Sequence, residues 1–145
     1  MTTDPREDTL CFLDSIGEAA CGSLSLHFLS EIIALFGQPV DENPTQAMQE
    51  KAFAALGLNW RYVTLEVAAA NLPDAVRGMR AMNFAGANCT IPHKIAVMPL
   101  LDEITPTAAK IGAVNTIIRR PEGGYLGENT DGKGFIQSLR EAGVD

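Results

Sequence analysis

The sequence contains few cysteines and few basic residues, and each shortage argues against a class of protein. Cys11, Cys21 and Cys89 are an odd number in no CxxC spacing, which argues against a disulfide framework and against a zinc site. The 11 basic residues are outnumbered by 18 acidic ones, for a formal net charge of −7, so nucleic-acid phosphates or anionic lipids would be held poorly. We therefore expect no metal and no nucleic-acid partner.

Signals for membranes and secretion are also missing. No apolar run approaches the roughly 20 residues that a spanning helix needs, and the charged N-terminus MTTDPREDTL is unlike the apolar core of a secretory signal. The sequence therefore predicts a cytoplasmic protein without membrane contact. With 145 residues, of which 46% are apolar, the chain is long enough to bury a hydrophobic core.

Short apolar runs alternate with helical patterns from residue 31 onward. Strands are predicted at 31–37, 60–67, 86–91, 113–119 and 125–128. Helical segments are predicted at 44–56, 72–82, 94–101, 107–111 and 134–142. The last two strands flank the turn Pro121-Glu122-Gly123-Gly124, which predicts a β-hairpin. The alternation predicts an α/β fold with a mainly parallel sheet, helices on both faces and one antiparallel hairpin strand. Residues 1–30 show no clean periodicity, and we treat them as an unassigned N-terminal extension.

Three polar segments lie at the ends of predicted strands, where open α/β sheets place their ligand sites. The first runs from Asn88 to Lys94, with Asn88 and Thr90 on one side of the strand. A lone lysine in such a place is usually a solvated surface charge. In the second, Asn115 interrupts an apolar strand, and a buried asparagine is either a structural bridge or a ligand contact. The third includes Thr130 and Asp131, whose side chains are also ordinary helix N-cap groups.

Taken together, the patterns GxNxTIPHK, IGAVNT and NTDGxGF, in this order, resemble the N-terminal substrate-binding domain of shikimate dehydrogenases and their quinate-using relatives. GQPV, FAALGL and the following Tyr62 extend the resemblance back to about Ile33, so residues 31–145 are predicted to form this domain. The resemblance implies an enzyme that reduces 3-dehydroshikimate to shikimate with NADPH, a step in aromatic amino acid biosynthesis.

The resemblance also implies roles for the matching residues. Lys94 would be the catalytic lysine and Asp131 its carboxylate partner. Hydride addition to a carbonyl leaves an oxyanion, and an ammonium held by a carboxylate can either protonate it or stabilise its charge. The implied substrate-binding residues are Asn43, Thr45, Asn88, Thr90, Asn115 and Thr130.

One stretch departs from the family pattern. The family's His-Ser-x-Ser-Pro segment, whose serines bind the substrate carboxylate, aligns here with residues 42–46. Asn43 and Thr45 can still donate hydrogen bonds to a carboxylate. Asp41 and Glu42, however, add two negative charges beside the place where an anion would bind. Either these two side chains point to solvent or the ligand is not the usual one.

The sequence contains no GxGxxG, so NADP(H) is expected to be bound mainly by a domain not present in this chain. Two alternatives to a shikimate dehydrogenase half are therefore kept. The chain could be a non-catalytic binding or regulatory module derived from this domain, or part of a dehydrogenase for quinate or another polyol carboxylate. Both a monomer and a homodimer are compatible with the sequence.

Overall fold

A computed structural model describes residues 29–144 and shows an α/β fold built on one six-stranded sheet. The strands are β1 (Glu31–Gly37), β2 (Trp60–Glu66), β3 (Gly86–Cys89), β4 (Glu103–Ile104), β5 (Thr116–Arg119) and β6 (Tyr125–Glu128). Their spatial order is β2-β1-β3-β5-β6-β4. The prediction of an N-terminal extension concerns residues that, except for 29 and 30, lie outside the described ones; so do Cys11 and Cys21.

Only one strand in this sheet runs against its neighbours. β1 is parallel to β2 and to β3, and β4 is parallel to β6, whereas β5 is antiparallel to both β3 and β6. The predicted mainly parallel sheet with one antiparallel hairpin strand is therefore confirmed. The hairpin turn contains Gly123 and Gly124, both at positive φ, a conformation that glycine adopts without steric cost.

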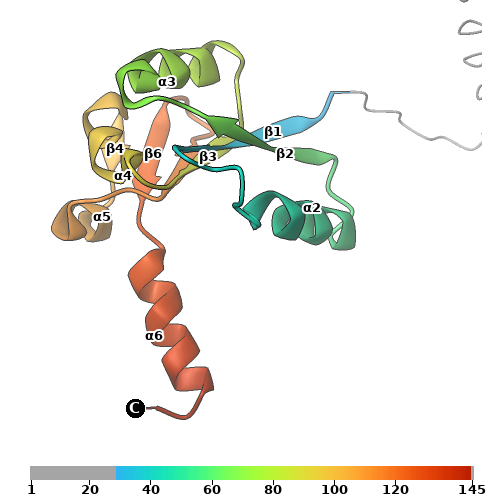
Figure 1. Ribbon diagram of the computed structural model, residues 1–145, viewed down its shortest axis with the longest axis vertical. Coiled ribbons are helices and arrows are strands. Elements are labelled where there is room, and N and C mark those ends of the chain that lie inside the picture. Colours follow the sequence, from blue (N-terminus) through green and yellow to red (C-terminus); the bar gives the residue numbers. More distant parts are fainter. Residues whose placement is uncertain (1–28, 145) are drawn as a thin grey trace, which may run out of the picture.

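Helices cover both faces of the sheet, as predicted (Figure 1). They are α2 (Thr45–Ala55), α3 (Leu72–Ala81), α4 (His93–Ala96), α5 (Pro106–Ile111) and α6 (Asp131–Glu141), with 3₁₀ turns at Ala69–Asn71 and Met98–Leu100. Side chains of β1 point alternately to the two faces. Ala34 and Phe36 join the larger core, which includes residues of α3 and α5, while Leu35 packs in a smaller core with Phe53 of α2.

Side chains of α2 cap the outer edge of β2, which is an edge strand of the sheet. The Tyr62 amide donates to Glu50 Oε1 at 2.5 Å, and the Thr64 amide donates to Gln46 Oε1 at 3.1 Å. Unpaired amides on an edge strand are a template for pairing with another chain. The caps therefore satisfy two of these amides within the chain.

Helix α6 is amphipathic but contributes no buried residue. Figure 1 shows it extending away from the sheet and the other helices. Phe135, for example, is 64% exposed. The helix begins at Asp131, three residues before the predicted start. The prediction began too late because Gly132 and Gly134 leave the first turn without an apolar pattern.

Residues 94–101 form two short helical pieces, as expected of a stretch that contains Pro99, which lies within the second piece. The two-residue strand β4 was not predicted at all. Within residues 29–144, no helix is long and apolar enough to cross a membrane.

Candidate active site

The polar segments singled out in the sequence meet at the edge of the sheet formed by the carboxyl ends of its parallel strands. β1, β3 and β6 end at this edge, and β5 begins there because it runs in the opposite direction. A cavity of about 300 Å³ lies at this edge. It is lined by all of the predicted site residues except Thr130, namely Asn43, Thr45, Asn88, Thr90, Lys94, Asn115 and Asp131.

An ion pair forms part of the cavity wall. Lys94 Nζ donates to Asp131 Oδ2 at 2.6 Å, with the two side chains 32% and 55% exposed. The hydrogen bond from Lys94 is the largest effect and holds the pKa of the Asp131 carboxyl below its ordinary value. Burial opposes it, and a weaker contribution from the Asn115 hydrogen bond again lowers the pKa. The backbone fixes the position of the lysine, since its carbonyl oxygen accepts from the Val114 amide at 2.7 Å.

Asn115 connects the strand β5 to the start of α6. Its Nδ2 donates to Asp131 Oδ1 at 2.7 Å and to Thr130 Oγ1 at 3.0 Å. Its Oδ1 accepts from the Thr130 amide at 3.0 Å and from Thr116 Oγ1 at 2.9 Å. Both ends of the amide are thus used within the protein, and Asn115 orients the carboxylate that pairs with Lys94. This also explains the place of Thr130, which contacts Asn115 instead of the cavity.

Two residues that sequence reasoning did not single out for the site support it through hydrogen bonds. Tyr62 donates its hydroxyl to Asn88 Oδ1 at 2.8 Å. Asn129, which is 3% exposed, donates to the Ala113 carbonyl at 3.0 Å and accepts from the Asp131 amide at 3.1 Å. A tyrosine in a strand of mixed polar and apolar residues gives no signal of its own. An asparagine two residues before Asp131 does, because asparagine commonly accepts from the backbone two residues on.

Other cavity groups are available to a ligand. Within residues 29–144, the Thr45 and Thr90 hydroxyls and Asn43 Nδ2 have no hydrogen-bond partner. Asn43 Oδ1 accepts from the Thr45 amide at 2.9 Å, which turns the nitrogen of the same side chain away from that turn. These three groups can donate to the oxygens of a polar ligand.

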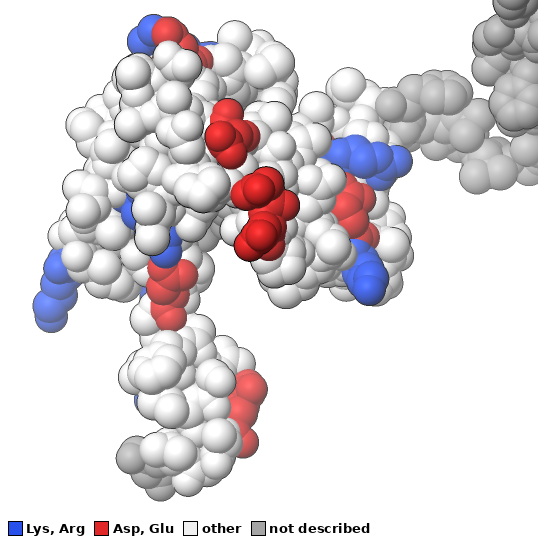
Figure 2. Space-filling model, viewed as in Figure 1, with Lys and Arg blue, Asp and Glu red and all other residues white. Residues whose placement is uncertain are grey.

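The charges around the cavity do not favour an anion. Lys94 and Asp131 cancel each other inside it, and the neighbouring Asp41 and Glu42 are exposed at the loop that precedes α2. Figure 2 shows acidic side chains in the middle of the face where Figure 1 draws this loop. Exposure in solvent screens both charges, so they weaken the binding of an anion without excluding it.

His93 and Cys89 serve the fold near the site. His93 is fully buried, and its Nε2 lies 2.7 Å from the Val67 carbonyl oxygen, to which it donates. Cys89 is 3% exposed, and burial raises the pKa of its thiol to about 12. Among residues 29–144 no three His, Cys, Asp or Glu side chains are grouped so that they could hold a metal ion.

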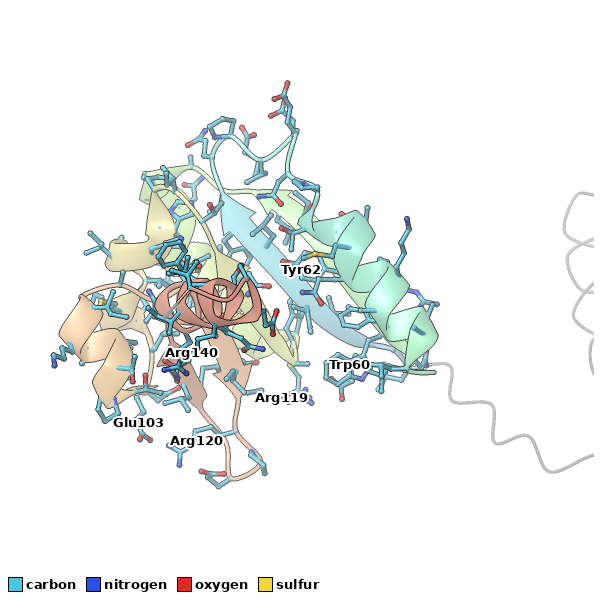
Figure 3. The ribbon with its side chains drawn as sticks, turned by 90° about the horizontal axis from the view of Figure 1, so that it is seen from below. Trp60, Tyr62, Glu103, Arg119, Arg120 and Arg140 are labelled. Atoms are coloured by element: carbon cyan, nitrogen blue, oxygen red, sulfur yellow. The ribbon has the colours of Figure 1, made fainter. Side chains whose placement is uncertain are left out.

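A larger cavity of about 480 Å³ is lined by Arg80, Arg119 and Arg120. Figure 3 shows Arg119, Arg120 and Glu103 in one region, apart from Tyr62. Each guanidinium is already paired with a carboxylate: Arg80 with Asp102, Arg119 with Glu31, and Arg120 with both Glu103 and Glu122. Although three arginines line this cavity, it therefore presents no unpaired cation to an anionic ligand.

Comparison with known proteins agrees with the motifs. Residues 35–117 match the family model of the shikimate dehydrogenase substrate binding domain. A shikimate dehydrogenase (NADP(+)) of Desulforamulus reducens is 47% identical over 120 residues, which cover 83% of this chain and 41% of that protein. The chain spans about 40% of the length of the curated relatives it matches.

Solved structures of relatives share this fold. Shikimate 5-dehydrogenase from Listeria monocytogenes, in complex with shikimate and NAD, aligns with a TM-score of 0.77 at 39% identity over 80% of this chain and 40% of its own. The ligand-free 5-ketofructose reductase of Gluconobacter sp. strain CHM43 aligns with a TM-score of 0.75 at 46% identity over 79% of this chain and 41% of its own.

Proposed function

Because the chain belongs to the shikimate dehydrogenase family through its substrate-binding domain, we propose that it is the substrate-binding, proton-handling half of an NADP-dependent dehydrogenase reducing 3-dehydroshikimate to shikimate. The observation that carries this proposal is the Lys94–Asp131 ion pair in the wall of a cavity with free hydroxyl and amide donors. A purely binding or regulatory module derived from this domain would need the donors but not the ion pair.

In this proposal, Lys94 faces the reacting oxygen of the substrate. Reduction adds a hydride to the carbonyl carbon and a proton to its oxygen; NADPH supplies the hydride. The Lys94 ammonium either gives the proton or stabilises the negative oxygen until water protonates it. Asp131 holds the ammonium in place, and Asn115 in turn holds the Asp131 carboxylate. The remaining substrate contacts are Asn43, Thr45, Asn88 and Thr90, with Thr130 acting next to Asn115.

The cofactor would be held mainly by a domain outside this chain. The sequence has no GxGxxG, and the glycine at the end of β1 offers no open space for a phosphate. At Gly37, where β1 ends, a Cβ would overlap Thr90 Cγ2 and Val40 Cγ1, so the protein's own side chains fill the space beside this glycine. We therefore assign no cofactor-binding residue here.

A second candidate is a dehydrogenase for a different polyol, either quinate or a neutral ketose. Asn43 and Thr45 stand where the family has its carboxylate-binding serines, and Asp41 and Glu42 add negative charge beside them. The Gluconobacter relative reduces 5-ketofructose, a sugar without a carboxylate, and it is 46% identical. These observations favour a test of neutral ligands beside shikimate.

The test begins with the 145-residue chain itself. Backbone amide resonances are followed by NMR during titration with shikimate, quinate and 5-ketofructose in turn, since half a site binds only in the millimolar range, about −4 kcal/mol. Shikimate-induced shifts clustered at Thr45, Thr90 and Lys94 support the main proposal. Shifts with quinate or 5-ketofructose alone favour the second candidate, and no shifts with any of the three contradict both.

Catalysis is tested in a chimera that joins this chain to the cofactor half of the Desulforamulus reducens relative. The expected result is NADP-dependent oxidation of shikimate that Lys94→Ala removes and Lys110→Ala leaves intact, because Lys110 lies exposed on α5. Full activity in the Lys94→Ala chimera would rule out the assigned role.

A further inference from the structure

The side chains of Tyr62 and Asn88, on the two strands that flank β1, meet across β1 on one face of the sheet. Tyr62 of β2 pairs with Ile33 of β1, and Asn88 of β3 pairs with Leu35 of β1. Ile33 and Leu35 point to the same face, the one covered by α2, so Tyr62 and Asn88 share that face too. The Tyr62 hydroxyl crosses β1 and lies 2.8 Å from Asn88 Oδ1. Figure 3 shows Tyr62 beside α2.

The environment of Asn88 permits only one orientation of its amide. Asn88 Nδ2 lies 3.2 Å from the Asn115 carbonyl oxygen, and a carbonyl can only accept a hydrogen bond. A flipped amide would place Oδ1 against that carbonyl, oxygen against oxygen. The nitrogen therefore faces Asn115, and the hydroxyl of Tyr62 must be the donor to Oδ1.

We propose that Tyr62 is a positioning residue, which acts through Asn88 and, together with the Asn115 carbonyl, holds this asparagine as an N–H donor to a ligand oxygen in the Lys94 cavity. The inference rests on the proposed function, because it assigns Asn88 to substrate binding. Asn88 lines that cavity together with Asn115. Its second Nδ2 hydrogen has only a long contact, 3.4 Å to Thr116 Oγ1, so a ligand oxygen can replace that partner at little cost.

The hydroxyl is suited to a permanent donor role. Tyr62 is 2% exposed, so water does not compete for its proton. Burial, with a smaller contribution from Cys89, raises the pKa of Tyr62 to about 12, and the hydroxyl keeps its proton at every pH at which the protein would work. The orientation of Asn88 is therefore independent of pH in this range.

The experiment compares two buried tyrosines. Tyr125 is a matched control, because it is 4% exposed and its hydroxyl donates to the Phe84 carbonyl at 2.7 Å, away from the cavity. We expect Tyr62→Phe to weaken shikimate binding to the 145-residue chain about tenfold, since Asn88 Oδ1 loses its donor and the amide is then held only at its nitrogen, by the Asn115 carbonyl. Tyr125→Phe should leave the dissociation constant unchanged.

A spectroscopic readout separates positioning from a general loss of stability. In the ligand-free protein, Tyr62→Phe should move the side-chain NH₂ resonances of Asn88, and Tyr125→Phe should not. In the wild type, nuclear Overhauser contacts should join the Asn88 NH₂ protons to Thr116 and not to the Tyr62 ring. This last measurement stands even if Tyr62→Phe does not fold.

The outcomes are distinct. Unchanged Asn88 resonances in Tyr62→Phe, equal loss of affinity in both variants, or NH₂ protons facing Tyr62 would each overturn the inference. Failure of the wild type to bind shikimate, quinate or 5-ketofructose, with the Asn88 signals as expected, would instead overturn the proposed function and leave the orientation of Asn88 established.

Discussion

The Lys94 ammonium lies 2.6 Å from Asp131 Oδ2 although 37 positions separate the two residues in the chain. Lys94 belongs to the short helix α4, and Asp131 is the first residue of α6. No buried core joins the two helices, since α6 buries no residue. The pair thus depends on the backbone that precedes each helix and on Asn115, which holds the carboxylate from its other side.

The contribution of this ion pair to stability should be lost at acidic pH. The pKa of Asp131 is lowered in the folded protein, so its contribution is fully present above the ordinary pKa near 3.8 and is lost as pH falls through the folded pKa. Lys94→Met removes the main cause of the lowering. The difference in unfolding free energy between wild type and Lys94→Met should therefore shrink between pH 5 and pH 2, measured by urea titration. A constant difference would contradict this.

Asn115→Asp should disturb the Asp131 carboxylate while the side chain at position 115 keeps its shape. The new side chain cannot donate to Asp131 Oδ1, which now receives a bond of 2.7 Å, and it adds a like charge in its place. We expect the pKa of Asp131 to rise, because both changes disfavour its charged form. A carbon-detected NMR titration of the carboxyl groups measures this; an unchanged Asp131 value would show that Asn115 does not orient the pair.

Cys89 should resist thiol reagents while the protein is folded. With a pKa of about 12, only about one thiol in ten thousand is ionised at pH 8, and the side chain is 3% exposed. The measurement is the labelling rate in a Cys11→Ser/Cys21→Ser protein, where Cys89 is the remaining thiol. Labelling should require denaturant, so rapid labelling in buffer would be inconsistent with the buried position.

Two glycine substitutions should have opposite effects. A Cβ at Gly86 would overlap the Ile117 carbonyl oxygen of the neighbouring strand, so Gly86→Ala should destabilise the protein by about 1–3 kcal/mol. A Cβ at Gly134 meets nothing within 4 Å, and Gly134→Ala should stabilise α6 by roughly 0.5–1 kcal/mol. Chemical unfolding measures the first effect, and amide hydrogen exchange in α6 measures the second. The same sign for both would contradict the packing described.

Glu50→Ala should loosen the outer edge of the sheet. The Tyr62 amide loses its acceptor, and the expected cost is about 1 kcal/mol of unfolding free energy. Hydrogen exchange at the Tyr62 amide should accelerate as well. Lys51→Ala is the control, because Lys51 is an exposed neighbour on the same helix. Equal exchange rates in the two variants would show that the cap contributes nothing.

Much of the fold could be predicted because local patterns and tertiary packing agree. The hairpin of β5 and β6 has a glycine turn at the required position, and β1 carries enough apolar residues to be buried on both faces. β4 could not be predicted, since two residues are too few for a periodic pattern. The extended reach of α6 was also beyond prediction, because an amphipathic pattern indicates that a face is to be buried but not against what.

The sequence predicted most of the polar residues that line the cavity and not the connections between them. The motifs contain these residues because chemistry restricts their types. The direction of each hydrogen bond depends on strand register, which the sequence states only indirectly. For that reason Asn115 was expected to contact either a ligand or the protein, and only the structure shows both ends of its amide occupied. Tyr62 reaches the site across an intervening strand, a relationship with no signature in local sequence.

The reversed strand β5 also bears on how the protein assembles. The polar residues that line the cavity come from separate segments of the chain between Asn43 and Asp131, and β5 pairs with β3 beside them. The cavity is therefore complete only after distant parts of the chain have paired. Folding dominated by such non-local contacts is slow compared with local helix formation. A ligand that bridges these segments binds only the finished sheet, and by mass action it would shift the population from partly assembled chains to the native state.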